Sequence, residues 1–95
     1  MNSKKVNIFM IDDHPSMIEG YKSILSYNDL GYEINVTSAF DCESAYKRMM
    51  KSEDLYEFDM VFLDLSLPPY EEKKINSGQD LALIAKKKYP FAFQS

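Results

Sequence analysis

Residues 60–65 read MVFLDL, the most strand-like run in the chain. It stops at residues 66–69, SLPP, where two consecutive prolines end any strand. A short run that is almost entirely apolar is typical of a strand buried on both faces of a parallel sheet. We therefore predict a strand over 60–65, with one aspartate, Asp64, near its end.

Two more strands are predicted on the N-terminal side of this run. Residues 6–11 read VNIFMI and are closed by Asp12 and Asp13. Residues 34–39 read INVTSA, in which Val36 and Thr37 favour an extended backbone. The chain therefore offers three short strands, and two of them end at aspartates.

Apolar residues at helical spacing follow each of these strands, which predicts three helices. Pro15 suits a first helical turn and Asp41 suits an N-cap, while the third helix must finish before Pro90. Residues 70–77 are predicted to be a polar loop. The residues that repeat at helical spacing are Met17, Ile18, Tyr21, Ile24 and Leu25, then Cys42, Ala45, Tyr46, Met49 and Met50, then Leu81, Ile84, Ala85 and Lys88.

The order βαβαβα predicts an α/β fold, with a parallel sheet and helices packed on both of its faces. The 95 residues are 45% hydrophobic and carry a net charge of −4, which indicates one folded domain over 1–95.

No stretch approaches the ~20 apolar residues that a membrane span needs. The single cysteine excludes an internal disulfide, and we expect a cytoplasmic protein. The acidic balance argues against direct contact with nucleic acid.

The acidic strand ends carry the predicted chemistry. Parallel strands end at the same edge of a sheet, so Asp12, Asp13 and Asp64 should converge there. If the first strand lies between the other two, this edge is a topological switch point, where ligands tend to bind. Uncompensated carboxylates repel one another, and a hard divalent cation, Mg²⁺ above all, would relieve this. A carboxylate beside such an ion can attack a phosphoryl group.

Three segments resemble the first signature segments of a response-regulator receiver domain. They are residues 11–15 (IDDHP), residues 61–68 (VFLDLSLP) and residues 77–81 (SGQDL), which together span nearly the whole chain in order. The resemblance implies a three-layer flavodoxin-like sheet with strand order 2-1-3 in the part present. It also implies that Asp64 is the phosphoacceptor, and that Asp12, Asp13, Asp64 and the backbone carbonyl of Ser66 hold Mg²⁺.

The resemblance further implies a role in two-component signalling rather than an enzyme. A phosphohistidine on a sensor histidine kinase would supply the phosphoryl group. The sequence DDHP at residues 12–15 is similar to that of receivers joined to DNA-binding output domains, which suggests transcription regulation by an output outside this chain.

Two departures from the family pattern accompany the resemblance. The loop before Gly78 is longer than usual, and the fourth and fifth strands, which end in Ser or Thr and in Lys, have no counterpart before Ser95. We therefore expect roughly the first three-quarters of a receiver, without the last two βα units. The third strand would then be an edge strand, so we expect homodimerisation there, with residues 91–93 adding a short strand.

Other interpretations remain open at this point. An Asp-nucleophile phosphohydrolase also places an aspartate after an apolar strand, but it usually carries a second acid two residues later, where this chain has Ser66. A phosphorylation-independent interaction module, or an inactive fragment, is the stronger rival. His14 follows the acidic pair, and we interpret it as a surface or supporting residue with no catalytic role.

Overall fold

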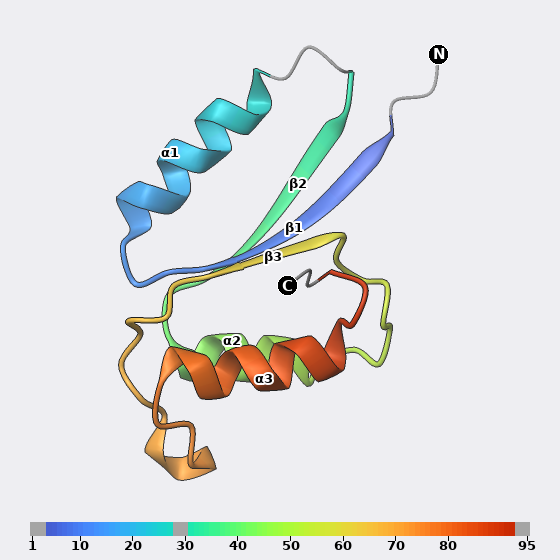
Figure 1. Ribbon diagram of the computed structural model, residues 1–95. Helices are drawn as coiled ribbons and strands as arrows, with labels where there is room; N and C mark the ends of the chain where they lie inside the picture. Colours follow the sequence, from blue (N-terminus) through green and yellow to red (C-terminus); the bar gives the residue numbers. More distant parts are fainter. Residues whose placement is uncertain (1–3, 28–30, 93–95) are drawn as a thin grey trace.

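The computed structural model describes residues 4–27 and 31–92. Three strands alternate with three helices, as predicted, and a short 3₁₀ helix precedes the last of them (Figure 1). The elements are β1 (Lys5–Ile11), α1 (Pro15–Ser26), β2 (Glu33–Ala39), α2 (Cys42–Met49), β3 (Met60–Leu63), η1 (Glu71–Lys73) and α3 (Gly78–Lys88).

The three strands form one parallel sheet in the order β2-β1-β3, so the predicted α/β class and strand order are confirmed. All seven residues of β1 pair with β2, from Lys5 opposite Glu33 to Ile11 opposite Ala39. Only Ile8–Ile11 pair with β3. This C-terminal part of β1 is also its buried part, because helices cover both faces of the sheet there.

Two hydrophobic clusters hold the three layers together. On one face of the sheet α2 and α3 pack against Phe9 and Ile11, and the Phe9 ring stacks on that of Phe58 with centroids 4.8 Å apart. On the other face α1 packs against Ile8 and Met10 through Ile18. Figure 1 shows α1 on one side of the sheet and the other two helices on the opposite side.

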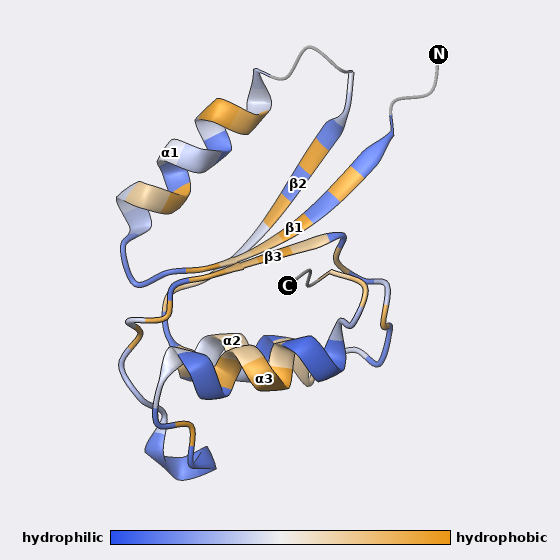
Figure 2. Ribbon diagram, viewed as in Figure 1, coloured by the Kyte–Doolittle hydropathy of each residue, from blue (hydrophilic) through white to orange (hydrophobic). Residues whose placement is uncertain are grey.

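The structure confirms the predicted helix α1, but only part of its apolar side is buried. Of the residues at helical spacing in α1, Ile18 is buried, but the side of the helix toward β3 is open. Met17 and Tyr21 are each 48% exposed and Ile24 is 70% exposed. The hydrophobic positions on α1 are visible in Figure 2. These side chains are exposed because the described residues place no further helix on this face of the sheet. The hydrophobic cluster there is therefore small.

Other boundaries also differ from prediction. β3 ends at Leu63 rather than at residue 65, because Asp64 begins a turn. Met50 caps the end of α2 and is 48% exposed instead of buried. Phe91 lies in a turn rather than an added strand, while residue 93 is outside the described residues.

The loop over residues 70–77 is more ordered than its polar sequence indicates. Tyr70 and Ile75 form an isolated antiparallel bridge around η1, and both side chains are buried. Ile75 is 1% exposed, so it anchors this loop to the larger hydrophobic cluster. The intervening charged residues are exposed, in agreement with prediction.

Asp41 caps α2, as predicted. Its carboxylate accepts a hydrogen bond from the Ser44 backbone N–H at 2.7 Å. Hydrogen bonds from the side chain and then the backbone of Ser44 lower the pKa of Asp41. Because the folded-state pKa is lowered, this stabilisation is complete above the ordinary pKa of an aspartate and is lost as the pH falls through the lowered value.

We expect Asp41→Ala to reduce the free energy of unfolding by about 1 kcal/mol at pH 7, because α2 loses its N-cap. The difference in unfolding free energy between the variant and the wild type should narrow as the pH falls through the lowered pKa of Asp41, because the carboxylate then becomes protonated and loses these hydrogen bonds. Urea unfolding at pH 7 and pH 3 measures both values. Asp41→Asn, which keeps a capping oxygen, is the control; a loss as large as that of Asp41→Ala would show that the cap is not the cause.

Candidate functional site

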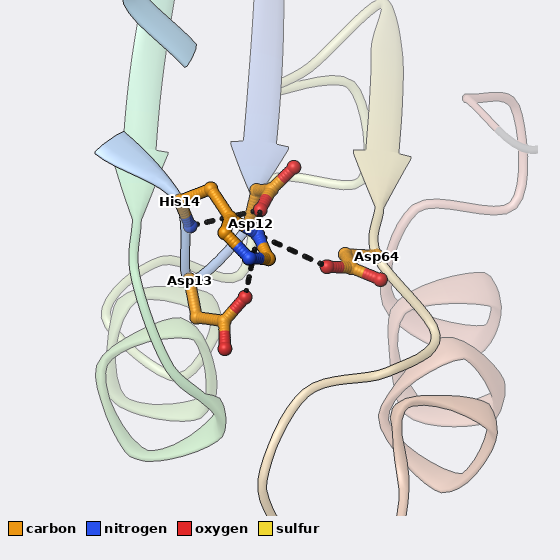
Figure 3. Close-up of side chains that lie close together, drawn as sticks. All are labelled: Asp12, Asp13, His14 and Asp64. Atoms are coloured by element: carbon orange, nitrogen blue, oxygen red, sulfur yellow. Dashed lines mark hydrogen bonds and ion pairs between the residues drawn. The ribbon is translucent and has the colours of Figure 1, made fainter. Parts of the chain in front are cut away.

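The three predicted carboxylates meet at the C-terminal edge of the sheet. Asp12 and Asp13 follow β1, and Asp64 follows β3 (Figure 3). One ligand atom from each of these residues and from His14 lies within 4.8 Å of the others. The predicted convergence is therefore confirmed, and the cluster includes one residue that was not predicted to belong to it.

Backbone pairing at the strand ends fixes two of these carboxylates. The Asp12 N–H donates to the Ala39 carbonyl oxygen at 3.0 Å, and the Asp64 N–H donates to the Ile11 carbonyl oxygen at 2.9 Å. Both residues thus continue the hydrogen-bond pattern of the sheet by one step beyond the strands. Their side chains are 21% and 23% exposed, so each is partly buried yet open to solvent.

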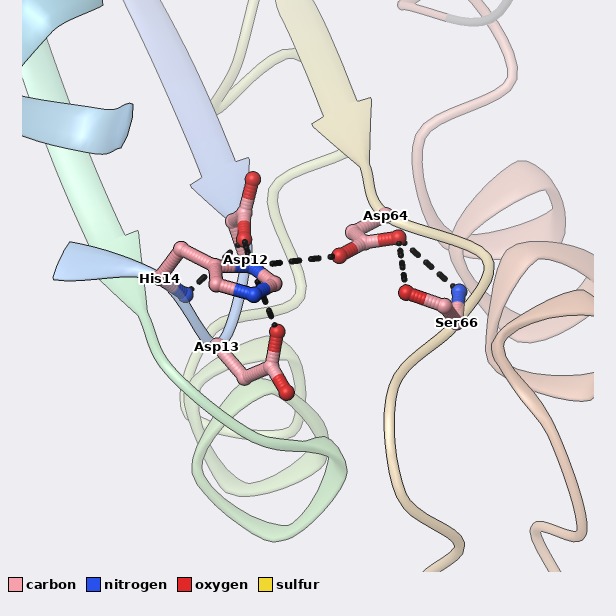
Figure 4. A network of polar contacts seen from close by, with 5 residues as sticks. All are labelled: Asp12, Asp13, His14, Asp64 and Ser66. Carbon is pink, nitrogen blue, oxygen red and sulfur yellow. Dashed lines mark hydrogen bonds and ion pairs between the residues drawn. The ribbon is translucent and has the colours of Figure 1, made fainter. Parts of the chain in front are cut away.

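Ser66 holds the Asp64 side chain in place. Its backbone N–H and its hydroxyl both donate to the Asp64 Oδ1, at 2.9 Å and 2.7 Å (Figure 4). These hydrogen bonds lower the pKa of Asp64, so it is ionised at neutral pH. The contacts of Ser66 with Asp64 are made by its N–H and hydroxyl, and the role expected for its carbonyl stays a prediction.

His14 lies among the carboxylates. Its Nδ1 is 2.9 Å from Asp12 Oδ1, 2.9 Å from Asp13 Oδ1 and 3.8 Å from Asp64 Oδ2. The hydrogen bond with Asp12, followed by the charge of Asp13, raises the pKa of His14. The ring is 60% exposed, as expected for a surface residue, but its contacts place it within the site.

The sequence contained a signal for the position of His14. Proline restricts the residue before it to an extended backbone, and His14 precedes Pro15 with φ −113° and ψ 93°. The chain therefore turns between β1 and α1 in a fixed way. This turn directs the imidazole back toward Asp12 and Asp13, which residue spacing alone did not predict.

No family model, curated protein or solved structure matches the chain. Within the described residues, no helix is long and apolar enough to cross a membrane.

The carboxylate cluster lies at one end of an open groove between α1 and β3. The groove has a volume of about 600 Å³ and is mostly apolar away from the cluster. Its apolar lining includes Met10, Met17, Ile18, Tyr21 and Phe62, and its polar lining consists of Asp12, His14 and Asp64. A ligand at the carboxylates would therefore lie beside a hydrophobic surface.

Gly78 sets the path of the chain just after Asp64. A Cβ at Gly78 would lie 2.6 Å from the Cα of Leu65 and 2.7 Å from its carbonyl oxygen. Both atoms belong to the backbone, so they could not move aside without moving the loop. The first turn of α3 thus packs directly against the residue that follows Asp64.

The donor set fits a hard divalent cation. Three carboxylates with oxygen atoms this close repel one another unless a positive charge lies between them. Mg²⁺ prefers carboxylate, carbonyl and water oxygens, and Asp12, Asp13 and Asp64 offer the carboxylates. The same arrangement leaves Asp64 ionised and accessible, which a nucleophile toward phosphorus requires.

Proposed function

We propose that the chain is a receiver domain of two-component signalling that accepts a phosphoryl group on Asp64. The observation that supports this most strongly is the juxtaposition of Asp64 with Asp12 and Asp13 at the end of a β2-β1-β3 parallel sheet. Strand β1 lies between its neighbours, so the cluster occupies a topological switch point. This order is also the basis for proposing a flavodoxin-like fold.

In the proposed reaction a carboxylate oxygen of Asp64 attacks the phosphorus of the donor. A new P–O bond forms, the bond from phosphorus to the leaving group breaks, and the leaving group keeps the electron pair and takes a proton. Bound Mg²⁺ would neutralise charge on the transferring oxygens. Asp12, Asp13, Asp64 and the Ser66 carbonyl would hold the ion, and the hydrogen bonds from Ser66 orient the nucleophile.

The proposal extends to partners and location. The donor would be a phosphohistidine on a sensor histidine kinase, and the output would be a separate domain, consistent with the DDHP sequence at residues 12–15. The chain itself would be a phosphoacceptor rather than an enzyme, acting in the cytoplasm. Contact with DNA would belong to the output domain, because this chain is acidic.

Intact mass spectrometry tests this function. After incubation with a small phosphodonor such as acetyl phosphate, we expect the wild-type chain to gain one phosphoryl group with Mg²⁺ and none with EDTA. A gain of the same size in EDTA would contradict the metal dependence. No gain under either condition would contradict the receiver function for this chain.

An interaction module that works without phosphorylation is the second candidate, and the open groove beside β3 favours it. The described residues pair β3 with β1 on one side only, and Met60 and Phe62 are 42% and 46% exposed. A phosphohydrolase is less well supported, since Ser66 hydrogen-bonds Asp64 at the place where such enzymes carry a second acid.

We propose that the outer edge of β3 pairs with a second copy of the chain. The strand reads MVFL and carries none of the charges that usually protect an edge. Sedimentation velocity should show a dimer at high concentration, and Phe62→Lys should shift it to monomer. Leu83→Lys on α3, also at an exposed position, is the control. A wild-type chain that stays monomeric at high concentration would contradict this pairing.

A further inference from the structure

His14 occupies a position that its role in the helix does not explain. It is the N-cap residue of α1, yet its side chain makes no capping hydrogen bond. The backbone supplies the constraint instead, because the His14 N–H donates to Asp12 Oδ1 at 2.9 Å and Pro15 follows. The imidazole therefore does not cap α1, and it points toward the carboxylates (Figure 3).

The separations between His14 and the carboxylates match those of ligands around one ion. Ligands about 2.1 Å from a metal and at right angles to each other lie about 3.0 Å apart. The Nδ1 atom lies 2.9 Å from oxygens of both Asp12 and Asp13. Its distance of 3.8 Å from Asp64 falls between the values for adjacent and opposite ligands.

We propose that His14 Nδ1 is a further protein ligand of the metal site, in addition to the proposed oxygen ligands. This inference rests on the proposed function for the carboxylates and changes the donor set from all-oxygen to mixed nitrogen and oxygen. Imidazole suits borderline first-row ions, whereas Mg²⁺ takes oxygen ligands. The site should therefore bind Mn²⁺, Co²⁺ and Ni²⁺ through His14 together with the oxygen ligands, and Mg²⁺ through the oxygen ligands alone.

The chain offers a direct test because His14 is its only histidine. In the Co²⁺-loaded protein, an imidazole N–H resonance with a large contact shift can come only from this residue, and only if its ring is bonded to the ion. A chain that binds Co²⁺ through His14 will show this resonance, and adding excess EDTA will remove it. We expect the contact-shifted N–H resonance in the wild type and none in His14→Phe, which keeps a ring but has no nitrogen.

Calorimetric titration gives the second measurement. We expect His14→Phe to lower the ratio of Ni²⁺ affinity to Mg²⁺ affinity by at least about tenfold. The ratio cancels any effect of the substitution on the carboxylates that changes the Ni²⁺ and Mg²⁺ affinities by the same factor. Ser23→Phe is a control at an exposed position of α1 outside the cluster, and its ratio should equal that of the wild type.

The two proposals fail in different ways. Mg²⁺ binding with no shifted imidazole resonances and an unchanged affinity ratio would overturn the role of His14 and leave the proposed function intact. Shifted resonances with Co²⁺ but no phosphoryl uptake with Mg²⁺ would support His14 as a ligand and contradict the receiver function. Failure to bind any divalent cation would overturn both.

Discussion

We expect Asp64→Asn to take up no phosphoryl group under conditions in which the wild type takes up one. The amide lacks the negative charge that attacks phosphorus and cannot form an acyl phosphate. The fold should persist, because the asparagine side-chain oxygen can still accept the hydrogen bonds that Ser66 donates to Asp64. Intact mass measures the uptake, and circular dichroism during thermal unfolding measures the fold.

Asp59→Asn is the matched control for this variant. Asp59 precedes β3, at the opposite end of the strand, and its carboxylate accepts a hydrogen bond from the Asn7 N–H at 2.7 Å. The same chemical change there should leave phosphoryl uptake intact. Uptake by Asp64→Asn equal to that of the wild type would show that another residue is the acceptor.

The second large effect is expected at Gly78. Gly78→Ala places a methyl group within 2.7 Å of backbone atoms of Leu65, so either α3 or the loop after Asp64 must shift. Overpacking of this kind costs about 1–3 kcal/mol. A displacement of about 1 Å at Asp64 could slow phosphoryl transfer on the order of 100-fold. Urea unfolding and the initial rate of mass gain measure the two losses.

Gly20→Ala is the control for Gly78→Ala. Gly20 lies inside α1, and a Cβ there would meet nothing within 4 Å. Alanine in a helix interior is favoured over glycine by about 0.5–1 kcal/mol, so this variant should be more stable than the wild type. If Gly78→Ala gained as much stability as Gly20→Ala and took up the phosphoryl group at the wild-type rate, the close approach to Leu65 would have no consequence for the site.

Much of the fold could be predicted because strands and helices have distinct hydrophobic periods. The apolar run at 6–11 and the aspartates that follow it were sufficient to predict a strand and the position of its C-terminal end. Asp41 was predictable as a cap from residue type alone, and the structure confirms its hydrogen bond to Ser44. The convergence of Asp12, Asp13 and Asp64 followed from a general property of parallel strands rather than from any local pattern.

The rest depended on tertiary structure. Helical spacing identified the apolar side of α1 but could not show that Met17 and Tyr21 would lie beside an open groove. The end of β3 depended on the turn at Asp64, which forms through hydrogen bonds from Ser66. Pro15 restricts the backbone of His14, but the direction of the imidazole toward Asp12 and Asp13 depended on the three-dimensional path of the chain between β1 and α1.

Chemical trapping of the phosphorylated residue tests the receiver function most directly. Borohydride reduces an aspartyl phosphate to homoserine, and peptide mass spectrometry then locates the change in the sequence. After phosphorylation in Mg²⁺, we expect homoserine at position 64 and aspartate at positions 12 and 13. Homoserine at either of those two positions, a phosphoryl group on His14, or a phosphorylated chain with unchanged Asp64 would contradict the assignment of Asp64 as the phosphoacceptor.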